Sequence, residues 1–123
     1  MATLLVIEDE APLRANLVRI LSTEGHQVIT ASDGDEGIQR ARESKPDLII
    51  CDVLMPRLDG YGVLASLRSQ PETAATPFVF LTASADKEDL ERGLKSGAND
   101  YVTKPFKIAD LLAAVARQLP PDK

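Results

Sequence analysis

Five short apolar runs, separated by segments with helical spacing, place the strongest limit on what this chain can fold into. The first, third and fourth runs are continuously apolar, which is typical of strands buried on both faces of a parallel sheet. Strands that alternate with helical segments favour one α/β sheet covered on both faces and exclude a helix bundle or a β-sandwich. The runs occupy residues 4–7, 28–31, 48–51, 78–81 and 101–103.

The segments between the runs contain helix signals. Pro12 suits a first helical turn, and Gly25 and Gly97 are stop signals. Asp33 and Asp86 are each followed three residues later by an acidic residue, as in an N-terminal cap. The clearest apolar stripe lies in the last predicted helix and consists of Ile108, Leu111, Leu112, Val115 and Leu119.

Composition is typical of a single domain that needs no disulfide. The 123 residues allow about one domain, and 44% hydrophobic residues suffice for one core. We assign residues 1–119 to this domain and residues 120–123 to a tail or the start of a linker. The single cysteine, Cys51, excludes a disulfide-rich secreted scaffold and favours the cytoplasm. No segment approaches the ~18 apolar residues of a membrane span, and a net charge of -5 disfavours binding to nucleic acid.

Informative polar residues follow four of the apolar runs. The first run ends at Glu8 and Asp9, the third at Asp52, the fourth at Thr82 and the fifth at Lys104. The carboxyl ends of parallel strands share one edge of the sheet, and ligands bind there. We therefore expect these side chains to form one acidic pocket.

Three carboxylates in one pocket require compensating positive charge. At a separation of about 5 Å and an effective dielectric constant of about 20, each pair costs about 3 kcal/mol. Mg²⁺ suits the pocket because it prefers oxygen ligands and keeps several waters. Zinc does not, because His26 is expected in a distant turn and the Cys51 side chain points opposite to that of Asp52. Lys104 supplies the second positive charge.

A carboxylate beside Mg²⁺, a lysine and a hydroxyl can accept a phosphoryl group by in-line transfer. Asp52 is the predicted nucleophile because it stands alone at the end of the central strand, whereas Glu8 and Asp9 are adjacent and better placed for metal and water. Singly, such residues are more often caps or turn residues. Their joint occurrence at the strand ends favours the chemical role.

These residues stand in motifs that resemble the receiver domain of two-component response regulators, the family that includes the chemotaxis regulator. The resemblance covers almost the whole chain. It implies a flavodoxin-like fold: a doubly wound, five-stranded parallel sheet of order 2-1-3-4-5. The matching segments are residues 4–9, 52–56, 59–60, 81–83, 97–101 and 104–106.

The resemblance implies a metal site and a phosphoacceptor. Asp52 would accept the phosphoryl group, and Mg²⁺ would be bound by Asp9, Asp52 and the backbone carbonyl of Leu54. Glu8 would act through a water molecule. It stands where the family more often has aspartate, which is one methylene shorter.

The resemblance also implies residues that respond to phosphorylation. Thr82 would hydrogen-bond the phosphoryl group, Lys104 would pair with it, and Tyr101 would change rotamer. The peptide bond after Lys104 is expected to be cis. Leu54 and Ser84 occupy the positions that are variable in the family and tune dephosphorylation, so the lifetime of the phosphorylated state stays open.

By this resemblance the chain is a signalling switch. A sensor histidine kinase or a phosphotransfer protein would supply the phosphoryl group from a phosphohistidine. The surface of the fourth helix, fifth strand and fifth helix would then change and bind an effector domain, a target protein or a second copy of the chain. The fourth helix should move readily because its apolar face is little more than Leu90 and Leu94. The domain would not be a conventional enzyme: it would catalyse only its own phosphotransfer and slow dephosphorylation.

Other classes of function stay open. A Mg²⁺-dependent phosphohydrolase with an aspartyl nucleophile would need an acid two residues after that nucleophile, where this chain has Leu54. A non-phosphorylated interaction domain of the same fold is a second alternative. A nucleotide- or flavin-binding module fits less well. Residues 60–65 match G-x-G-x-x-A but do not directly follow a strand, and the acidic turn after the first strand would repel a phosphate.

Overall fold

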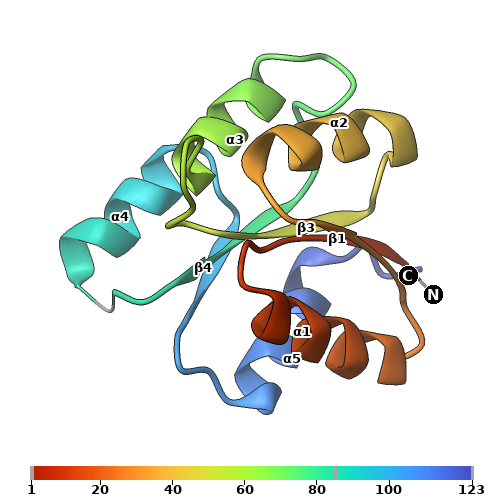
Figure 1. Ribbon diagram of the computed structural model, residues 1–123. Coiled ribbons are helices and arrows are strands. Elements are labelled where there is room, and N and C mark those ends of the chain that lie inside the picture. Colours follow the sequence, from red (N-terminus) through yellow and green to blue (C-terminus); the bar gives the residue numbers. More distant parts are fainter. Residues whose placement is uncertain (1, 85, 123) are drawn as a thin grey trace.

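The computed structural model describes residues 2–84 and 86–122 (Figure 1). In this part of the chain, five strands form one parallel sheet in the order β2-β1-β3-β4-β5, which confirms the flavodoxin-like prediction. The elements in chain order are β1 (Thr3–Ile7), α1 (Ala11–Thr23), β2 (Gln27–Ala31), α2 (Gly34–Ser44), β3 (Leu48–Asp52), α3 (Gly60–Arg68), β4 (Phe78–Thr82), α4 (Lys87–Lys95), β5 (Asp100–Thr103) and α5 (Ile108–Gln118).

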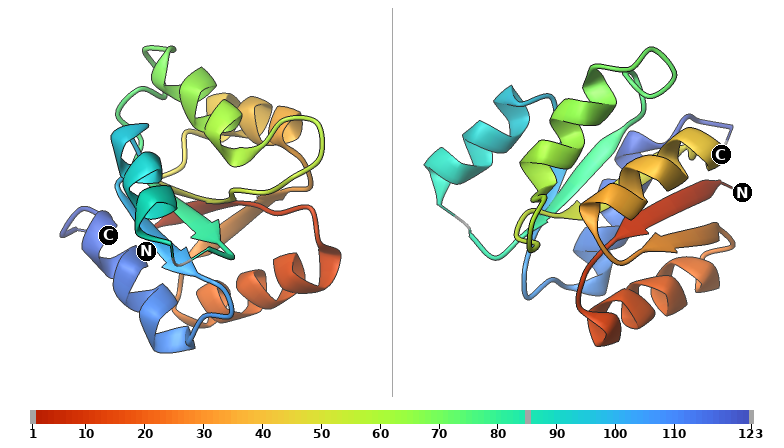
Figure 2. Two further views of the ribbon diagram at one scale, coloured as in Figure 1. Left: turned by 90° about the vertical axis from the view of Figure 1, so that its left-hand side faces the viewer. Right: turned by 45° about the horizontal axis from the view of Figure 1, so that its top comes forward.

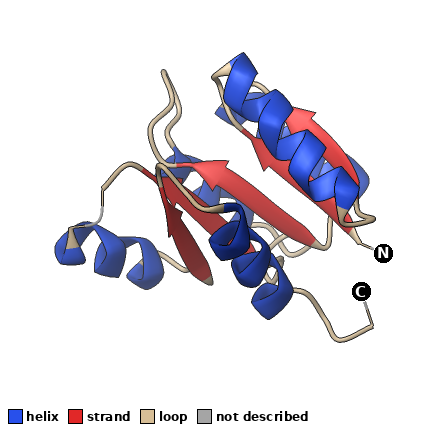
Figure 3. Ribbon diagram, turned by 90° about the horizontal axis from the view of Figure 1, so that it is seen from below, coloured by secondary structure: helices blue, strands red, loops and turns tan. Residues whose placement is uncertain are grey.

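Helices cover both faces of the sheet. Figures 1 and 3 show α1 and α5 on one face, and Figure 2 shows α2, α3 and α4 on the other. Successive residues of a strand point to opposite faces, so Leu4 and Val6 pack with α1 and α5, whereas Leu5 and Ile7 pack with α2 and α3. Every residue of β3 and β4 is buried, as the continuous apolar runs predict. None of the helices in the described residues combines the length and apolarity that a bilayer crossing requires.

The N-terminal cap of α2 forms as its sequence predicts. The Asp33 carboxylate accepts a hydrogen bond from the Glu36 backbone N–H at 2.8 Å. The Glu36 carboxylate in turn accepts one from the Ser32 backbone N–H at 2.6 Å, one residue before the cap. This reciprocal pair fixes the point at which the chain turns from β2 into α2.

α4 is held by fewer contacts than the other helices. Its N-cap Asp86 accepts from the Glu88 backbone N–H at 2.9 Å, but Asp89 does not complete a capping box. The Asp89 carboxylate instead accepts a hydrogen bond from the Ser84 hydroxyl at 2.7 Å. Gly93 is the one buried residue among the described residues of α4. The predicted light anchoring of this helix is therefore confirmed.

One residue of the predicted apolar stripe in α5 lies outside the core. Leu111 and Val115 are buried against the sheet, and Leu112 packs beside them. Ile108 is 55% exposed, because it is the first residue of the helix, which begins beyond the carboxyl end of β5. Ile108 therefore belongs to the apolar stripe by its spacing but is not part of the core.

The glycines at residues 60 and 62 lie at close contacts of α3. Gly60 begins α3 directly against the backbone at the end of β3. A Cβ atom at this position would lie 2.5 Å from the carbonyl oxygen of Asp52 and 2.9 Å from the Cα of Val53. At Gly62, a Cβ atom would meet Cδ1 of Leu58, at the end of a side chain that can shift. Packing against backbone thus explains the first glycine of the G-x-G-x-x-A match without a bound nucleotide.

We expect Gly60→Ala to lower the free energy of unfolding by about 1–3 kcal/mol, because the new methyl group meets backbone that cannot move aside easily. Urea unfolding measures this change. Gly93→Ala is the matched control. Its Cβ would meet only the Phe80 ring, at 3.2 Å, and alanine favours a helix interior by up to about 1 kcal/mol. Equal stability of Gly60→Ala and the wild type would contradict the packing role.

Candidate functional site

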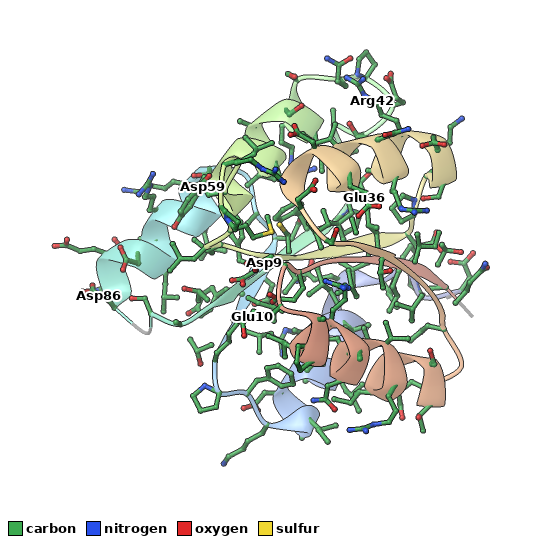
Figure 4. The ribbon with its side chains drawn as sticks, viewed as in Figure 1. Asp9, Glu10, Glu36, Arg42, Asp59 and Asp86 are labelled. Atoms are coloured by element: carbon green, nitrogen blue, oxygen red, sulfur yellow. The ribbon has the colours of Figure 1, made fainter. Side chains whose placement is uncertain are left out.

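The carboxyl ends of the strands bring three predicted carboxylates together. Glu8 and Asp9 follow β1, and Asp52 is the last residue of the neighbouring β3. Each side chain offers an oxygen atom, and these atoms all lie within 4.8 Å of one another. Figure 4 shows Asp9 beside Glu10 in the turn between β1 and α1. Asp9 is the most open of the three to solvent, and the other two are buried.

Lys104 supplies the compensating charge. Its Nζ lies 2.9 Å from Asp52 Oδ2 and 3.4 Å from Glu8 Oε1, although these partners are 52 and 96 residues away in the chain. Burial tends to lower the pKa of Lys104, but the hydrogen bond that its ammonium donates to Asp52 and the charges of the two carboxylates outweigh this effect, so the pKa lies above its ordinary value. The ammonium group therefore stays charged at neutral pH.

Glu8 is fully buried and is the unusual acid of the cluster. The pKa of Glu8 is raised from 4.5 to about 7. Burial is the largest cause and the Asp52 charge adds to it, whereas the hydrogen bond from the Glu10 N–H and the charge of Lys104 lower the pKa by less. Glu8 Oε2 accepts that Glu10 N–H at 3.1 Å. One lysine does not compensate the buried carboxylates completely, so the cluster retains affinity for a proton or another cation.

Asp52 is held from two sides. Its Oδ2 accepts from Lys104, and its Oδ1 accepts from the backbone N–H of Leu54 at 3.3 Å. The residue is only 4% exposed, whereas the Leu54 side chain lies at the surface and is 72% exposed. Leu54 thus contacts the carboxylate through its backbone, and its apolar side chain offers no acid or base.

Thr82 is the last residue of β4, which neighbours β3, and Tyr101 lies in β5, which neighbours β4. The Thr82 carbonyl accepts from the backbone N–H of Lys104 at 2.7 Å, and its Oγ1 accepts from the Ser84 N–H at 3.1 Å. Thr82 and the half-buried Tyr101 line the same small cavity, together with Phe80 and residues of α4. The peptide bond between Lys104 and Pro105 is cis, as expected.

His26 and Cys51, the residues that a zinc site would need, do not join the cluster, in agreement with the rejection of zinc. His26 precedes β2 at the amino end of the sheet, and its Nδ1 accepts from the Ala2 backbone N–H at 3.3 Å. Cys51 is fully buried in the core beneath α2 and α3. The donor set at the cluster consists of oxygen atoms, which favours a hard cation.

Sequence reasoning did not identify Arg14 as part of this region. Its Nη1 donates to the backbone carbonyl of Glu8 at 2.8 Å and lies 3.5 Å from that of Asp9. The available signal was its position, one helical turn after the acidic residues. That spacing alone does not show whether a side chain turns back toward the strand end or out to solvent.

The geometry agrees with the comparisons to known proteins. A family model for the response regulator receiver domain matches residues 4–116, so the chain belongs to this family. It is 40% identical over 121 residues to the phosphate regulon transcriptional regulatory protein PhoB of Escherichia coli, covering 96% of this chain and 53% of PhoB. It is 44% identical over 107 residues to the transcriptional regulatory protein AfsQ1 of Streptomyces coelicolor, covering 87% of this chain and 46% of AfsQ1.

The solved structures agree. The chemotaxis protein CheY4 of Vibrio cholerae superposes with a TM-score of 0.91 at 33% identity, over 97% of this chain and 99% of CheY4. The chain spans about half the length of the curated relatives it matches. The family is one of two-component signalling proteins, and these relatives are transcriptional regulators.

The pKa of Glu8 predicts a pH dependence of stability. Between its ordinary value of 4.5 and about 7, folded Glu8 holds a proton that the unfolded chain has lost. This contribution to stability is therefore present below the lower value and is lost as the pH rises through the upper one. Glu8→Gln should shrink the fall in unfolding free energy between about pH 5 and about pH 8 by about 1–3 kcal/mol.

Urea unfolding at both pH values without Mg²⁺ measures this difference. Glu43→Gln, on the exposed face of α2, is the control and should keep the wild-type dependence. An identical pH dependence in Glu8→Gln and the wild type would show that Glu8 titrates normally.

Proposed function

We propose that this chain is a phosphorylation-activated switch that accepts a phosphoryl group on Asp52. The donor is a phosphohistidine of a sensor histidine kinase or of a phosphotransfer protein. One observation carries the proposal: the nearly buried Asp52 carboxylate lies 2.9 Å from the Lys104 ammonium and within 4.8 Å of two further carboxylates. An ordinary structural aspartate at a strand end needs no such cluster.

The residues of the cluster fit Mg²⁺. The donors are carboxylate oxygens, and one of them, Asp9, is open enough to leave room for water ligands. In this proposal Asp9, Asp52 and the Leu54 carbonyl hold the ion, and Glu8 contributes through water. The raised pKa of Glu8 supports a cation here, because burial and the Asp52 charge leave the site short of positive charge. When bound, Mg²⁺ neutralises charge on the phosphoryl oxygens.

The protein groups orient the transfer. A carboxylate oxygen of Asp52 attacks phosphorus in line, the phosphorus–nitrogen bond to the donor histidine breaks, and the imidazole leaves with that electron pair. Lys104 fixes the Asp52 carboxylate beforehand and pairs with the phosphoryl oxygens afterwards. The domain thus catalyses its own phosphotransfer and a slow hydrolysis of the product.

Thr82 starts the response. Its Oγ1 accepts from the Ser84 N–H, so the hydroxyl proton is available to a new acceptor. Phosphorylation adds charge and acceptor oxygens at Asp52. Charge-assisted hydrogen bonds contribute about 1.5–3 kcal/mol each, and two or three reach the ~5.5 kcal/mol that shifts an equilibrium from 1:99 to 99:1. Movement of Thr82 gives Tyr101 room in their shared cavity.

The output surface in this proposal is formed by α4, β5 and α5. It binds a downstream effector domain or target protein, or a second phosphorylated copy, and makes no direct contact with nucleic acid or membrane. Residues 1–119 form the receiver and residues 120–123 begin a tail or linker. The proposed location is the cytoplasm.

Acetyl phosphate with Mg²⁺ tests the acceptor. The wild type should gain the mass of one phosphoryl group, and Asp52→Asn should gain none. Asp35→Asn, an exposed acid in the first turn of α2, is the control and should be labelled like the wild type. Labelling of Asp52→Asn would show that Asp52 is not the phosphoacceptor. Turnover without an adduct would indicate a phosphohydrolase, and neither result would indicate a non-phosphorylated interaction domain.

Thr82→Ala tests the route from the acceptor to the surface. We expect nearly normal labelling of Asp52, because the hydroxyl is not the nucleophile, but a large loss of the phosphorylation-dependent change in amide exchange across α4 and β5. Hydrogen exchange with and without acetyl phosphate measures it. Thr23→Ala, in α1, should respond like the wild type. A full exchange response in Thr82→Ala would refute its part in the switch.

A further inference from the structure

The turn that presents Glu8 and Asp9 lacks an ordinary helix cap. Glu10 occupies the N-cap position of α1 but makes no side-chain capping bond, and the first turn of the helix contains no acidic residue. Besides the backbone bond from the Glu8 N–H to the Ala31 carbonyl at 3.1 Å, two contacts that involve side chains hold this turn. One is the bond from the Glu10 N–H to Glu8 Oε2, and the other comes from Arg14.

Arg14 joins the helix to the acidic turn. Its backbone N–H donates to the Glu10 carbonyl at 2.9 Å and closes the first turn of α1. Its half-buried side chain runs back toward the helix N-terminus, the usual direction for a long side chain in a helix. There its Nη1 reaches the carbonyl of Glu8 at 2.8 Å, with that of Asp9 at 3.5 Å.

The two contacts differ in the atoms they use. The Glu10 N–H occupies a carboxylate oxygen of Glu8, and Lys104 lies at the other oxygen. Arg14 uses only backbone carbonyl oxygens. Its contact therefore persists when the Glu8 carboxylate turns to another partner, and it leaves the carboxylates of Glu8 and Asp9 available to a cation.

We infer that Arg14 is a positioning residue for the Mg²⁺ site. By binding the two carbonyls, its guanidinium fixes the backbone from which the Glu8 and Asp9 carboxylates project. This inference rests on the proposed function, because it concerns the same cluster. Groups that orient metal ligands are commonly worth a factor of about 10–100 in metal affinity.

A positioning role and a role as a nearby charge predict opposite results. The guanidinium is a positive charge beside the acidic cluster, and a positive charge repels Mg²⁺. If Arg14 acted only as a charge, its removal would tighten Mg²⁺ binding. If Arg14 positions the ligands, its removal weakens binding. The sign of the change separates the two roles.

Calorimetric titration of the full chain with Mg²⁺, without any phosphodonor, measures this sign. We expect Arg14→Met to bind Mg²⁺ about tenfold more weakly than the wild type. Arg14→Lys should lie between them, because lysine keeps the charge but lacks the planar fork of donors. Arg19→Met is the matched control: Arg19 lies on the same helix, is exposed and contacts Asn16, so its removal should leave the affinity unchanged.

Equal or tighter binding by Arg14→Met would overturn the inference. Urea unfolding without Mg²⁺ shows whether each variant folds. If Arg14→Met does not fold, Arg14→Lys decides, since weaker binding at constant charge supports positioning and wild-type affinity overturns it. The mass gain of the wild type with acetyl phosphate is measured separately. If the wild type is labelled and the Arg14 variants bind Mg²⁺ with unchanged affinity, only the inference about Arg14 is wrong. If the wild type binds no Mg²⁺, the proposed metal site is wrong as well.

Discussion

The contact between the Lys104 ammonium and the buried carboxylates of Asp52 and Glu8 is the constraint on which the rest of the site depends. Removing one partner of a buried ion pair costs about 3–5 kcal/mol, because the other charge is left uncompensated. Lys104 is also fixed through its backbone, which donates to the Thr82 carbonyl at 2.7 Å. One residue after β5 therefore connects the ends of β1, β3 and β4, so the weakly apolar edge strand β5 cannot shift without disturbing the acidic cluster.

This compensation is incomplete, and the shortage of positive charge underlies the proposed binding of a cation. Two buried carboxylates share one lysine, and the pKa of Glu8 rises to about 7. Near neutral pH a bound cation competes with that proton, so cation affinity and protonation of Glu8 are linked. A second buried lysine would remove this shortage and stabilise the fold, but it would also remove the attraction for a divalent cation on which the proposed function depends. The cluster is therefore better suited to binding than to stability.

The alternation of strands and helices predicted a parallel sheet and the convergence of Glu8, Asp9, Asp52 and Lys104, because parallel strands end at one edge wherever their loops lead. The strand order came from the family resemblance. The roles of these residues, which came partly from their positions and partly from the family resemblance, are proposals. The direction in which a side chain points was harder to predict from the sequence. Ile108 has core spacing yet is exposed at a helix start, and Asp89 has capping spacing yet binds Ser84. The direction of Arg14 likewise depends on how α1 leaves the strand, which spacing does not encode.

In the proposed switch, the weak anchoring of α4 means that a few new hydrogen bonds at Asp52 would suffice to move it. The contacts of its described residues with its neighbours include Gly93 against Phe80, the Arg92 guanidinium 4.2 Å from the centre of the Tyr61 ring, and the bond between Ser84 and Asp89. An exposed cation–π contact contributes about 0.5–1 kcal/mol and a hydrogen bond about 1 kcal/mol. These are smaller than the ~5.5 kcal/mol required of the switch. Because the Ser84 N–H also donates to Thr82, the contact that holds α4 shares a residue with the group that phosphorylation would displace.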